Sequence, residues 1–131
     1  MQNAIANLSV KTMEPKAKGN FGEAIANRWI KKKLKMKVIA RNYCSPFGEI
    51  DLIAQKGDTF AFFEVKLRTS IQMGNPEESV NLSKQNKIRR TAIHFLVKRG
   101  LNPESTDFGF WIISIQKQGK KFNIRCIPNA F

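Results

Sequence analysis

Three carboxylates and a lysine with strand-like spacing lie between residues 49 and 66. Glu49 and Asp51 alternate in one run of residues, and Glu64 and Lys66 alternate in the next. Side chains two residues apart in a β-strand point to one face of the sheet, so each pair shares a face if these runs are strands. Carboxylate oxygens are the ligands that Mg²⁺ prefers, and a lysine beside them can stabilise charge that develops on phosphorus. The stretch is therefore a candidate site for metal-dependent phosphodiester chemistry.

The residues around these four have the pattern of a β-hairpin. Residues 49–55 and 59–67 are rich in β-branched and aromatic side chains. Between them, the Gly57-Asp58 dipeptide predicts a two-residue turn. Such a turn fixes which residues of the two strands oppose each other.

This register places Asp51 opposite Glu64 and Glu49 opposite Lys66, with β-carbons about 5 Å apart. Two carboxylates this close repel each other, so a cation is expected between them. We predict that Asp51 and Glu64 bind Mg²⁺ or Mn²⁺, with the carbonyl of Val65 as a candidate third ligand. Lys66 would position water or stabilise the transition state. Glu49 would orient the ligands or hold a second ion.

The Glu-x-Lys spacing is weak by itself. Seven Glu and sixteen Lys predict about one such triplet by chance, and Glu14-Pro15-Lys16 is another example. The alternative is an exposed ion-pair ladder of Glu49 with Lys66, which contributes about 0–1 kcal/mol per pair. The aspartate on the preceding strand favours a site over a ladder.

The net charge of the chain predicts an anionic partner. The 23 Lys+Arg and 10 Asp+Glu give a formal net charge of +13 at pH 7. Residues 1–48 and 71–131 each carry ten basic side chains, against two and four acidic ones, whereas residues 49–70 carry three basic and four acidic. This pattern suits carboxylates that hold a metal ion between flanks that hold phosphates. We expect a nucleic acid, RNA or DNA, as the partner; the alternative is a basic protein whose charge only keeps it dispersed.

Several other classes of protein are excluded by the sequence. Cys44 and Cys126 form neither a disulfide framework nor a zinc-ligand spacing, and are expected to be small apolar residues. No apolar run has the length of a transmembrane helix, and residues 1–19 lack the apolar core of a secretory signal. We therefore expect a cytoplasmic protein without membrane association.

The length suits one domain, which we place at residues 19–131 after a flexible basic arm at residues 1–18. The order of predicted elements is α-β-β-β-α-β-β. It predicts an α/β fold with a mixed central sheet flanked by helices. The predicted elements are a helix from Asn20 to about Lys35, strands at 36–42, 49–55 and 59–67, a short helix at Glu77-Glu78, a helix at 83–99, and strands at 108–116 and 121–127.

Several charged residues outside the hairpin have two interpretations. Glu23 either caps the helix that begins at Asn20 or leans towards the carboxylates. Lys84 either contacts a phosphate or is solvated, and Arg68 is a candidate phosphate clamp.

The helix at 83–99 is predicted to bury one stripe and to expose a basic face. The only histidine lies on that face, where a surface role is favoured over catalysis. Both tryptophans are expected in the core or at an interface rather than as base-stacking platforms. The buried stripe comprises Ile88, Ala92, Phe95 and Leu96, and the basic face comprises Lys84, Lys87, Thr91, His94 and Lys98.

Motifs spread from about residue 18 to the end resemble the bacterial YraN family. They are Gly22-Glu23, Arg41-Asn42, residues 48–54 and 63–68, Gly74-Asn75-Pro76, Lys84 and residues 128–131. That family resembles the restriction-endonuclease-like, PD-(D/E)xK fold, near the archaeal Holliday-junction resolvases. The resemblance implies an αβββαβ core and metal-dependent DNA cleavage as the ancestral activity. It also implies Glu23, Asp51, Glu64 and Lys66 as the site.

The chain departs from the family pattern in its late strand, where Gly109-Phe110-Trp111 stands in place of Arg-Phe-Asp. Ile50 also occupies the place of the proline in the PD motif. Neither departure touches the predicted ligands.

The combined interpretation is a Mg²⁺-dependent endonuclease-like protein that acts on DNA, including branched or single-stranded forms. Arg41, Arg68, Lys84 and Lys87 are its candidate nucleic-acid contacts. The alternatives are a nucleic-acid-binding module of the same fold without turnover and a protein-binding adaptor. Resolvase-like relatives are dimers, so a homodimer with Trp111 or Phe131 at its interface is a further expectation by analogy.

Overall fold

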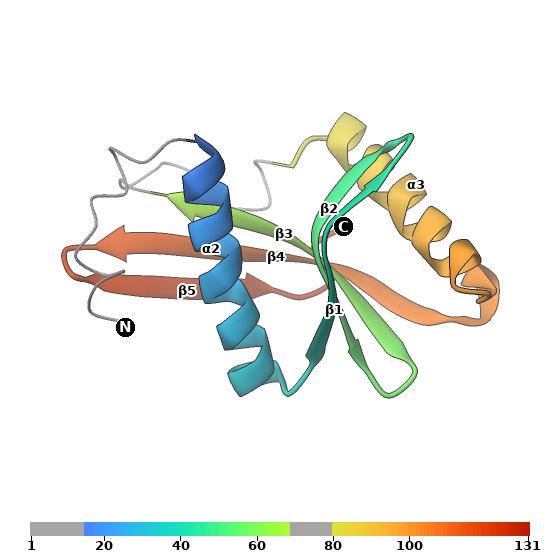
Figure 1. Ribbon diagram of the computed structural model, residues 1–131, viewed down its shortest axis with the longest axis horizontal. Helices are drawn as coiled ribbons and strands as arrows, with labels where there is room; N and C mark the ends of the chain where they lie inside the picture. Colours follow the sequence, from blue (N-terminus) through green and yellow to red (C-terminus); the bar gives the residue numbers. More distant parts are fainter. Residues whose placement is uncertain (1–14, 69–79) are drawn as a thin grey trace.

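Two helices pack on opposite faces of one mixed β-sheet (Figure 1). The computed structural model describes residues 15–68 and 80–131, with side chains from residue 20 onward. In chain order the elements are α2 (Pro15–Trp29), the π-helical turn η2 (Ile30–Leu34), β1 (Lys37–Ser45), β2 (Gly48–Lys56), β3 (Thr59–Arg68), α3 (Leu82–Lys98), the 3₁₀ turn η4 (Pro103–Ser105), β4 (Asp107–Gln118) and β5 (Lys121–Ile127).

The five strands of the described chain lie in the order β1-β2-β3-β4-β5. Helix α3 connects β3 to β4, which are parallel, whereas the other neighbours are antiparallel. The predicted α/β fold, with a mixed central sheet flanked by helices, is therefore confirmed.

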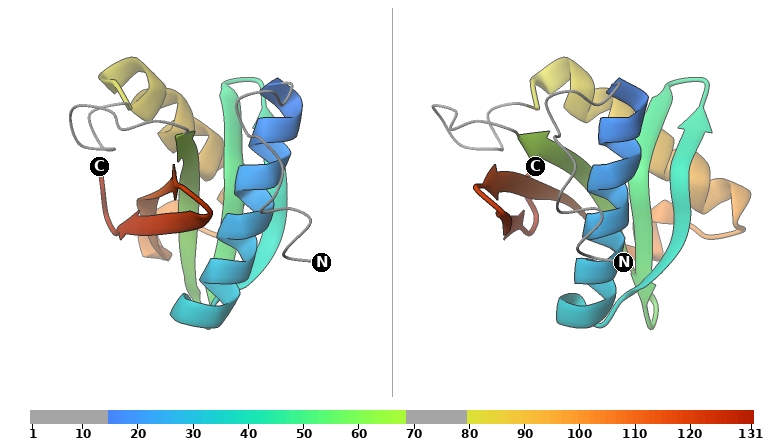
Figure 2. Two further views of the ribbon diagram at one scale, coloured as in Figure 1. Left: turned by 90° about the vertical axis from the view of Figure 1, so that its left-hand side faces the viewer. Right: turned by 60° about the vertical axis from the view of Figure 1, so that its left-hand side comes forward.

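The alternation of side chains along β3 divides the core into two layers. Phe60 and Phe62 point towards α3 and pack with Phe95, whereas Ala61 and Phe63 point towards α2. Figure 2 shows strands of the sheet between the two helices. Because both faces are covered, the central strand is apolar until it reaches Glu64.

The first helix starts earlier than predicted. It begins at Pro15 rather than Asn20, and proline is well suited to the first turn because its missing N–H has no partner there. The predicted cap at Asn20 with Glu23 is therefore wrong. Residues 15–18 of the predicted arm belong to this helix, whereas residues 1–14 lie outside the described residues, as do the predicted loop at 71–76 and the short helix at Glu77-Glu78.

The first strand is longer than predicted because the turn that follows it is tighter. Strand β1 continues to Ser45, and only Pro46 and Phe47 separate it from β2. The predicted strands at 49–55, 59–67, 108–116 and 121–127 are confirmed within two residues at each end.

Helix α3 has the predicted ends and the predicted buried stripe. The side chain of Asn81 accepts a hydrogen bond from Lys84 N at 2.9 Å, and Gly100 adopts a left-handed φ of 81° just after the last turn. Ile88, Ala92, Phe95 and Leu96 are buried as predicted.

The face of α3 predicted to be basic is exposed at Lys87 and Lys98, as expected, but its middle packs against the β1–β2 hairpin. Thr91 is fully buried, and its Oγ1 lies 2.8 Å from Ser45 Oγ while donating to the carbonyl of Lys87. His94 Nδ1 lies 2.9 Å from the hydroxyl of Tyr43. The prediction was wrong here because the hairpin supplies polar partners that helical periodicity does not reveal.

The C-terminal residues close the core beside α3. Ala130 N donates to the carbonyl of Phe110 at 2.7 Å, and Phe131 stacks on the ring of Phe110. Gly109, a departure from the family pattern, makes room for this tail, since a Cβ there would lie 2.5 Å from Asn129 Oδ1. Phe131 and Trp111 are both partly buried against the core rather than exposed.

The two cysteines are free and differ in environment. Cys126 is half-buried, and burial raises the pKa of its thiol to about 11. Cys44 is exposed, so its prediction as an apolar residue is wrong. Among the described residues, no helix is long and apolar enough to cross a membrane.

The Thr91 contact predicts a measurable contribution to stability. Thr91→Val keeps the shape of the side chain but leaves Ser45 without its buried partner, so the free energy of unfolding should fall by about 1–3 kcal/mol in urea titrations. The double variant Ser45→Ala/Thr91→Val should lose less than the sum of the two single variants. Additive losses would show that the two hydroxyls do not interact.

Candidate functional site

The predicted site lies where β2 and β3 part. The two strands pair from Lys56 with Thr59 as far as Leu52 with Phe63, which confirms the predicted register over this part of the hairpin. Beyond Leu52 the ladder ends. We call the space between Gly48–Asp51 of β2 and Glu64–Arg68 of β3 the fork; in Figure 1, β2 turns away from β3 at this end.

The neighbouring strands explain why the ladder stops. Gly48 to Asp51 stay with β1, whose pairing with β2 runs to Ser45 opposite Gly48. Glu64 to Arg68 stay with β4 in a continuous parallel ladder. The two halves of the sheet therefore separate, and backbone polar groups between them require other partners.

The carboxylate of Asp51 supplies one of these partners. Asp51 Oδ2 accepts a hydrogen bond from Val65 N at 2.8 Å. The predicted backbone pairings of Asp51 with Glu64 and of Glu49 with Lys66 are therefore wrong. A side chain, rather than the next backbone pair, joins the strands at this point.

Glu64 is the buried charge of the fork. Its residue is 7% exposed, and its Oε1 accepts a hydrogen bond from Lys84 Nζ at 2.6 Å and lies 3.4 Å from Lys66 Nζ. Both ion pairs recorded among the described residues involve Glu64, so the alternative ladder of Glu49 with Lys66 is not formed. Two ammonium groups compensate a carboxylate that would otherwise be costly to bury.

Asp51 lies in a less favourable environment. Burial raises the pKa of Asp51 from its ordinary value of 3.8 to about 7, and the negative charge of Glu64 contributes in the same direction. The Val65 N–H and the more distant charge of Lys84 oppose this shift. The carboxyl is therefore poised to exchange its proton near neutral pH.

The two lysines differ in protonation behaviour. Burial lowers the pKa of Lys66, which Glu64 partly offsets while Lys84 adds to the decrease. Burial also disfavours the charge of Lys84, but its hydrogen bond to Glu64 and the charge of that carboxylate raise its pKa overall. The sequence predicts Lys84 as a candidate phosphate contact. In the structure it is the closer of the two lysines to Glu64.

Glu23 reaches the fork from α2. Gly22 lets the helix approach β3 closely, since a Cβ at that position would lie 3.3 Å from Leu67 Cβ. Glu23 itself is buried, and this burial raises the pKa of its carboxyl against the opposing effects of Asn42 and Arg41. The charges of Glu49 and Glu64 also act on it, so the helix places a further carboxylate beside the predicted ligands.

Asn42 was missed as a functional candidate. It adopts a left-handed φ of 48°, which asparagine tolerates better than most residues, and its side chain hydrogen-bonds Glu23. Since its neighbours Arg41 and Tyr43 pair with Leu52 and Ile50, Asn42 stands across from Asp51. Its place in the Arg-Asn motif was the only signal in the sequence.

The remaining predicted residues surround the fork at different distances. Arg41 is exposed and acts electrostatically on Glu23, and Arg68 is half-buried at the end of β3. Glu49 is exposed on a cavity of about 350 Å³ that Lys84 and Lys87 also line. The cavity lies between the start of α3 and the start of β2.

The donor set of the fork suits a hard cation with few protein ligands. Within the described residues there is no group of three or more His, Cys, Asp or Glu side chains placed to hold a metal ion. Mg²⁺, however, takes only one or two carboxylates from a protein and keeps several waters. Asp51 and Glu64 supply two carboxylates whose mutual repulsion a cation would relieve.

Comparison with known proteins places the chain in a family. Residues 22–124 match the model described as uncharacterised protein family UPF0102. The chain belongs to the UPF0102 family. The YraN proteins belong to UPF0102, so the resemblance to the YraN family is confirmed. The matched range includes Glu23, Asp51, Glu64, Lys66 and Lys84.

Similar proteins from several bacteria align with this chain over nearly their whole length. A UPF0102 protein of Aliivibrio fischeri is 41% identical over 113 residues, which are 86% of this chain and 91% of that protein. A UPF0102 protein of Alkaliphilus metalliredigens is 40% identical over 116 residues, 88% of this chain and 98% of the relative. One from Dictyoglomus turgidum is 36% identical over 119 residues, covering 91% of this chain and all of the relative.

The raised pKa of Asp51 predicts how stability depends on pH in metal-free protein. Between pH values of about 4 and 7 the folded protein holds a proton that the unfolded chain has released, so the contribution of Asp51 to the free energy of unfolding falls as pH rises. Asp51→Asn, which keeps an acceptor for Val65 N, should therefore be more stable than wild type at pH 8, by roughly 1–3 kcal/mol, and similar to it near about pH 4.

Urea titrations in a chelating buffer measure this difference. Asp58→Asn, at an exposed position of the hairpin turn, is the matched control and should show little change with pH. An Asp51→Asn stability gain that is independent of pH would contradict the predicted titration.

Proposed function

We propose that this protein is a Mg²⁺- or Mn²⁺-dependent endonuclease that binds DNA, including branched or single-stranded forms, and cleaves it at the fork. The observation that supports this most directly is the closeness of Asp51 and Glu64. Two carboxylates that destabilise each other, with Lys66 beside them, lie at a break in the sheet of a strongly basic chain.

Asp51 and Glu64 would hold the ion. A divalent cation bound there would lower the pKa of a bound water and offset negative charge on the phosphodiester. Lys66, whose pKa is lowered by burial, would orient the water or donate a hydrogen bond to a non-bridging phosphate oxygen. Glu23 and Glu49 would orient the ligands from α2 and β2. These roles require Asp51 to be ionised.

The fold supports the same proposal. The order α2-β1-β2-β3-α3-β4 and the parallel pairing of β3 with β4 agree with the αβββαβ core that the family resemblance implies. The resemblance to Holliday-junction resolvases also supports DNA as the substrate and a homodimer as the assembly. Arg41, Arg68 and Lys87 lie around the fork, where they would contact phosphates on either side of the reacting one.

One observation favours a second candidate, a nucleic-acid-binding module without turnover. Lys84 Nζ lies 2.6 Å from Glu64 Oε1, and this carboxylate oxygen is one that would bind the ion. Catalysis requires this ammonium to move aside or to share the carboxylate with the cation. A protein that only binds nucleic acid would keep the pair intact.

Cleavage assays separate the two candidates. With Mg²⁺ or Mn²⁺ and a panel of branched, single-stranded and duplex DNA, Glu64→Gln and Lys66→Met should each reduce the rate by about 10²-fold or more. Glu104→Gln, at an exposed position in η4, is the matched carboxylate control and should cleave like wild type. Tight, salt-dependent binding with no metal-dependent cleavage by wild type would overturn the enzyme proposal and leave the binding module.

Metal binding itself should depend on the proton of Asp51. Because the ion and the proton compete for one carboxylate, the Kd for Mn²⁺ should rise by about tenfold for each unit that the pH falls below 7 and should level off above it. Calorimetric titration of wild type, Asp51→Asn and Glu104→Gln measures this, and only Asp51→Asn should lose both affinity and pH dependence. A pH-independent Kd in wild type would exclude Asp51 as a ligand.

A further inference from the structure

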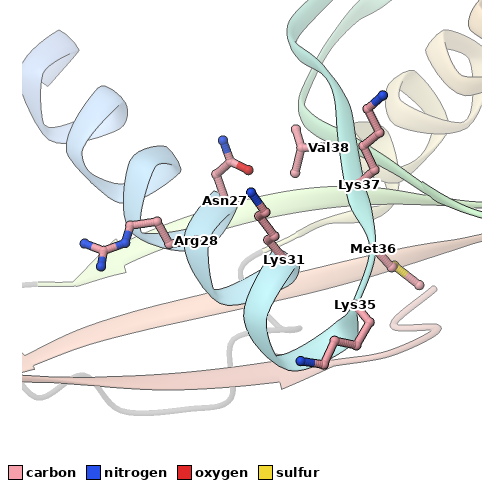
Figure 3. Close-up of a pocket in the computed structure, with 7 residues that line it drawn as sticks. All are labelled: Asn27, Arg28, Lys31, Lys35, Met36, Lys37 and Val38. Atoms are coloured by element: carbon pink, nitrogen blue, oxygen red, sulfur yellow. The ribbon is translucent and has the colours of Figure 1, made fainter.

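A basic region lies at the other end of α2, where the chain turns from the helix into β1. The turn borders an open hollow of about 640 Å³, which Figure 3 shows with its lining residues. Asn27 and Lys31 line it from the helical side, Lys35 from the turn, and Lys37 and Val38 from β1. None of these residues belongs to the fork.

The charge of this region has one sign. Residues 24–48 contain seven basic side chains and no acidic one. Lys31, Lys35 and Lys37 are exposed, and the two ion pairs found in the described part of the chain both lie at Glu64. A hollow lined by several exposed lysines attracts an anion with repeated charges.

The backbone explains why lysines that are separated in the sequence line one hollow. The last residues of the helical region form a π turn that buries Ile30, and Lys35 then adopts a left-handed φ of 57°. The chain therefore reverses at once, and β1 runs back beside the helix (Figure 1). Lysines of the turn and of the strand thus line the same hollow. Local π turns of this kind occur frequently at functional sites.

One face of the helical region runs beside β1 from the fork to the hollow, and we call this line the seam. Glu23, Asn27 and Lys31 are spaced by four residues, so they lie along one face of the helix. At one end of the seam, Lys31 and Val38 of β1 line the same hollow. At the other end, the side chain of Glu23 is hydrogen-bonded to that of Asn42. Eight residues of helix span about 12 Å, which is the axial length of roughly three to four phosphates of one strand at 3.4 Å each.

We propose that this hollow binds the sugar–phosphate backbone of a nucleic-acid strand, a few nucleotides away from the part of the strand that lies at the fork. The position of the strand relative to the fork rests on the proposed function. Binding in the hollow is argued only from the shape and the charge of the hollow. Lys31, Lys35 and Lys37 line a recess rather than a flat surface. An extended polyanion can follow such a recess more closely than a flat anionic bilayer can, so the shape favours nucleic acid over a membrane surface.

The test compares two triple variants with the same change of charge. The hollow variant, Lys31→Gln/Lys35→Gln/Lys37→Gln, removes three positive charges that line the hollow. The control variant, Lys98→Gln/Lys120→Gln/Lys121→Gln, removes three exposed lysines at the end of α3 and in the β4–β5 hairpin. Binding of labelled single-stranded and duplex DNA is measured against salt concentration with metal chelated. Each lost phosphate contact reduces the log–log salt slope by about 0.7–0.9, so the hollow variant should lose roughly 2–3 in slope and about 10²-fold in affinity near 0.1 M salt.

Three results decide the inference, and a folding control accompanies them. A clearly shallower slope for the hollow variant than for the control supports it, even if wild type cleaves no DNA and the proposed catalytic function fails. Equal slopes for the two variants overturn it, even if Glu64-dependent cleavage is observed. Loss of binding to phosphatidylserine vesicles in the hollow variant, with unchanged binding to DNA, also overturns it in favour of a membrane surface. Urea titration of both variants excludes unfolding as the cause, and an unfolded triple variant is replaced by the single variant Lys31→Gln, with an expected slope loss of about 0.7–0.9.

Discussion

The site depends on the hydrogen bond that Val65 N donates to the carboxylate of Asp51, because this bond joins β2 to β3 where their ladder ends. At this point β2 continues with β1, and β3 continues with β4, so no backbone pair joins them. Without a side-chain acceptor, the N–H of Val65 would lack this partner at a partly buried position. Asp51 supplies that acceptor and is thereby held next to Glu64. The separation of the strands and the assembly of the carboxylates are thus one structural event.

The electrostatics of the fork follow from this placement. Glu64 is stabilised by two lysines, whereas Asp51 is left with one backbone donor and a nearby negative charge. The pKa of Asp51 rises accordingly, and the metal-free fork is an unfavourable arrangement that a cation would improve. A structural ion-pair cluster would have no need of this second, poorly compensated carboxylate. The cost of keeping it is therefore the main physical argument for a functional role.

The two helices contribute to function from opposite faces of the sheet. Helix α3 brings Lys84 onto Glu64 and anchors the β1–β2 hairpin through Thr91, so it fixes one side of the fork. Helix α2 brings Glu23 to the other side, and the same face of this helix continues to Lys31 and the basic hollow. The carboxylates occupy the break in the sheet and the cations surround it, which is the arrangement that an anionic, extended ligand requires.

The sequence by itself determined the order of the elements, the hairpin register from Lys56 to Leu52, and the run in which Asp51, Glu64 and Lys66 lie. These follow from short-range patterns, since strand alternation and turn chemistry act over a few residues. Only the tertiary structure decided that the ladder ends before Asp51, that Lys84 pairs with Glu64, and that Thr91 is buried beneath a hairpin. Those contacts join residues twenty or more positions apart or depend on how neighbouring strands diverge. No local pattern encodes them, because sheet twist and helix packing are set by the whole core.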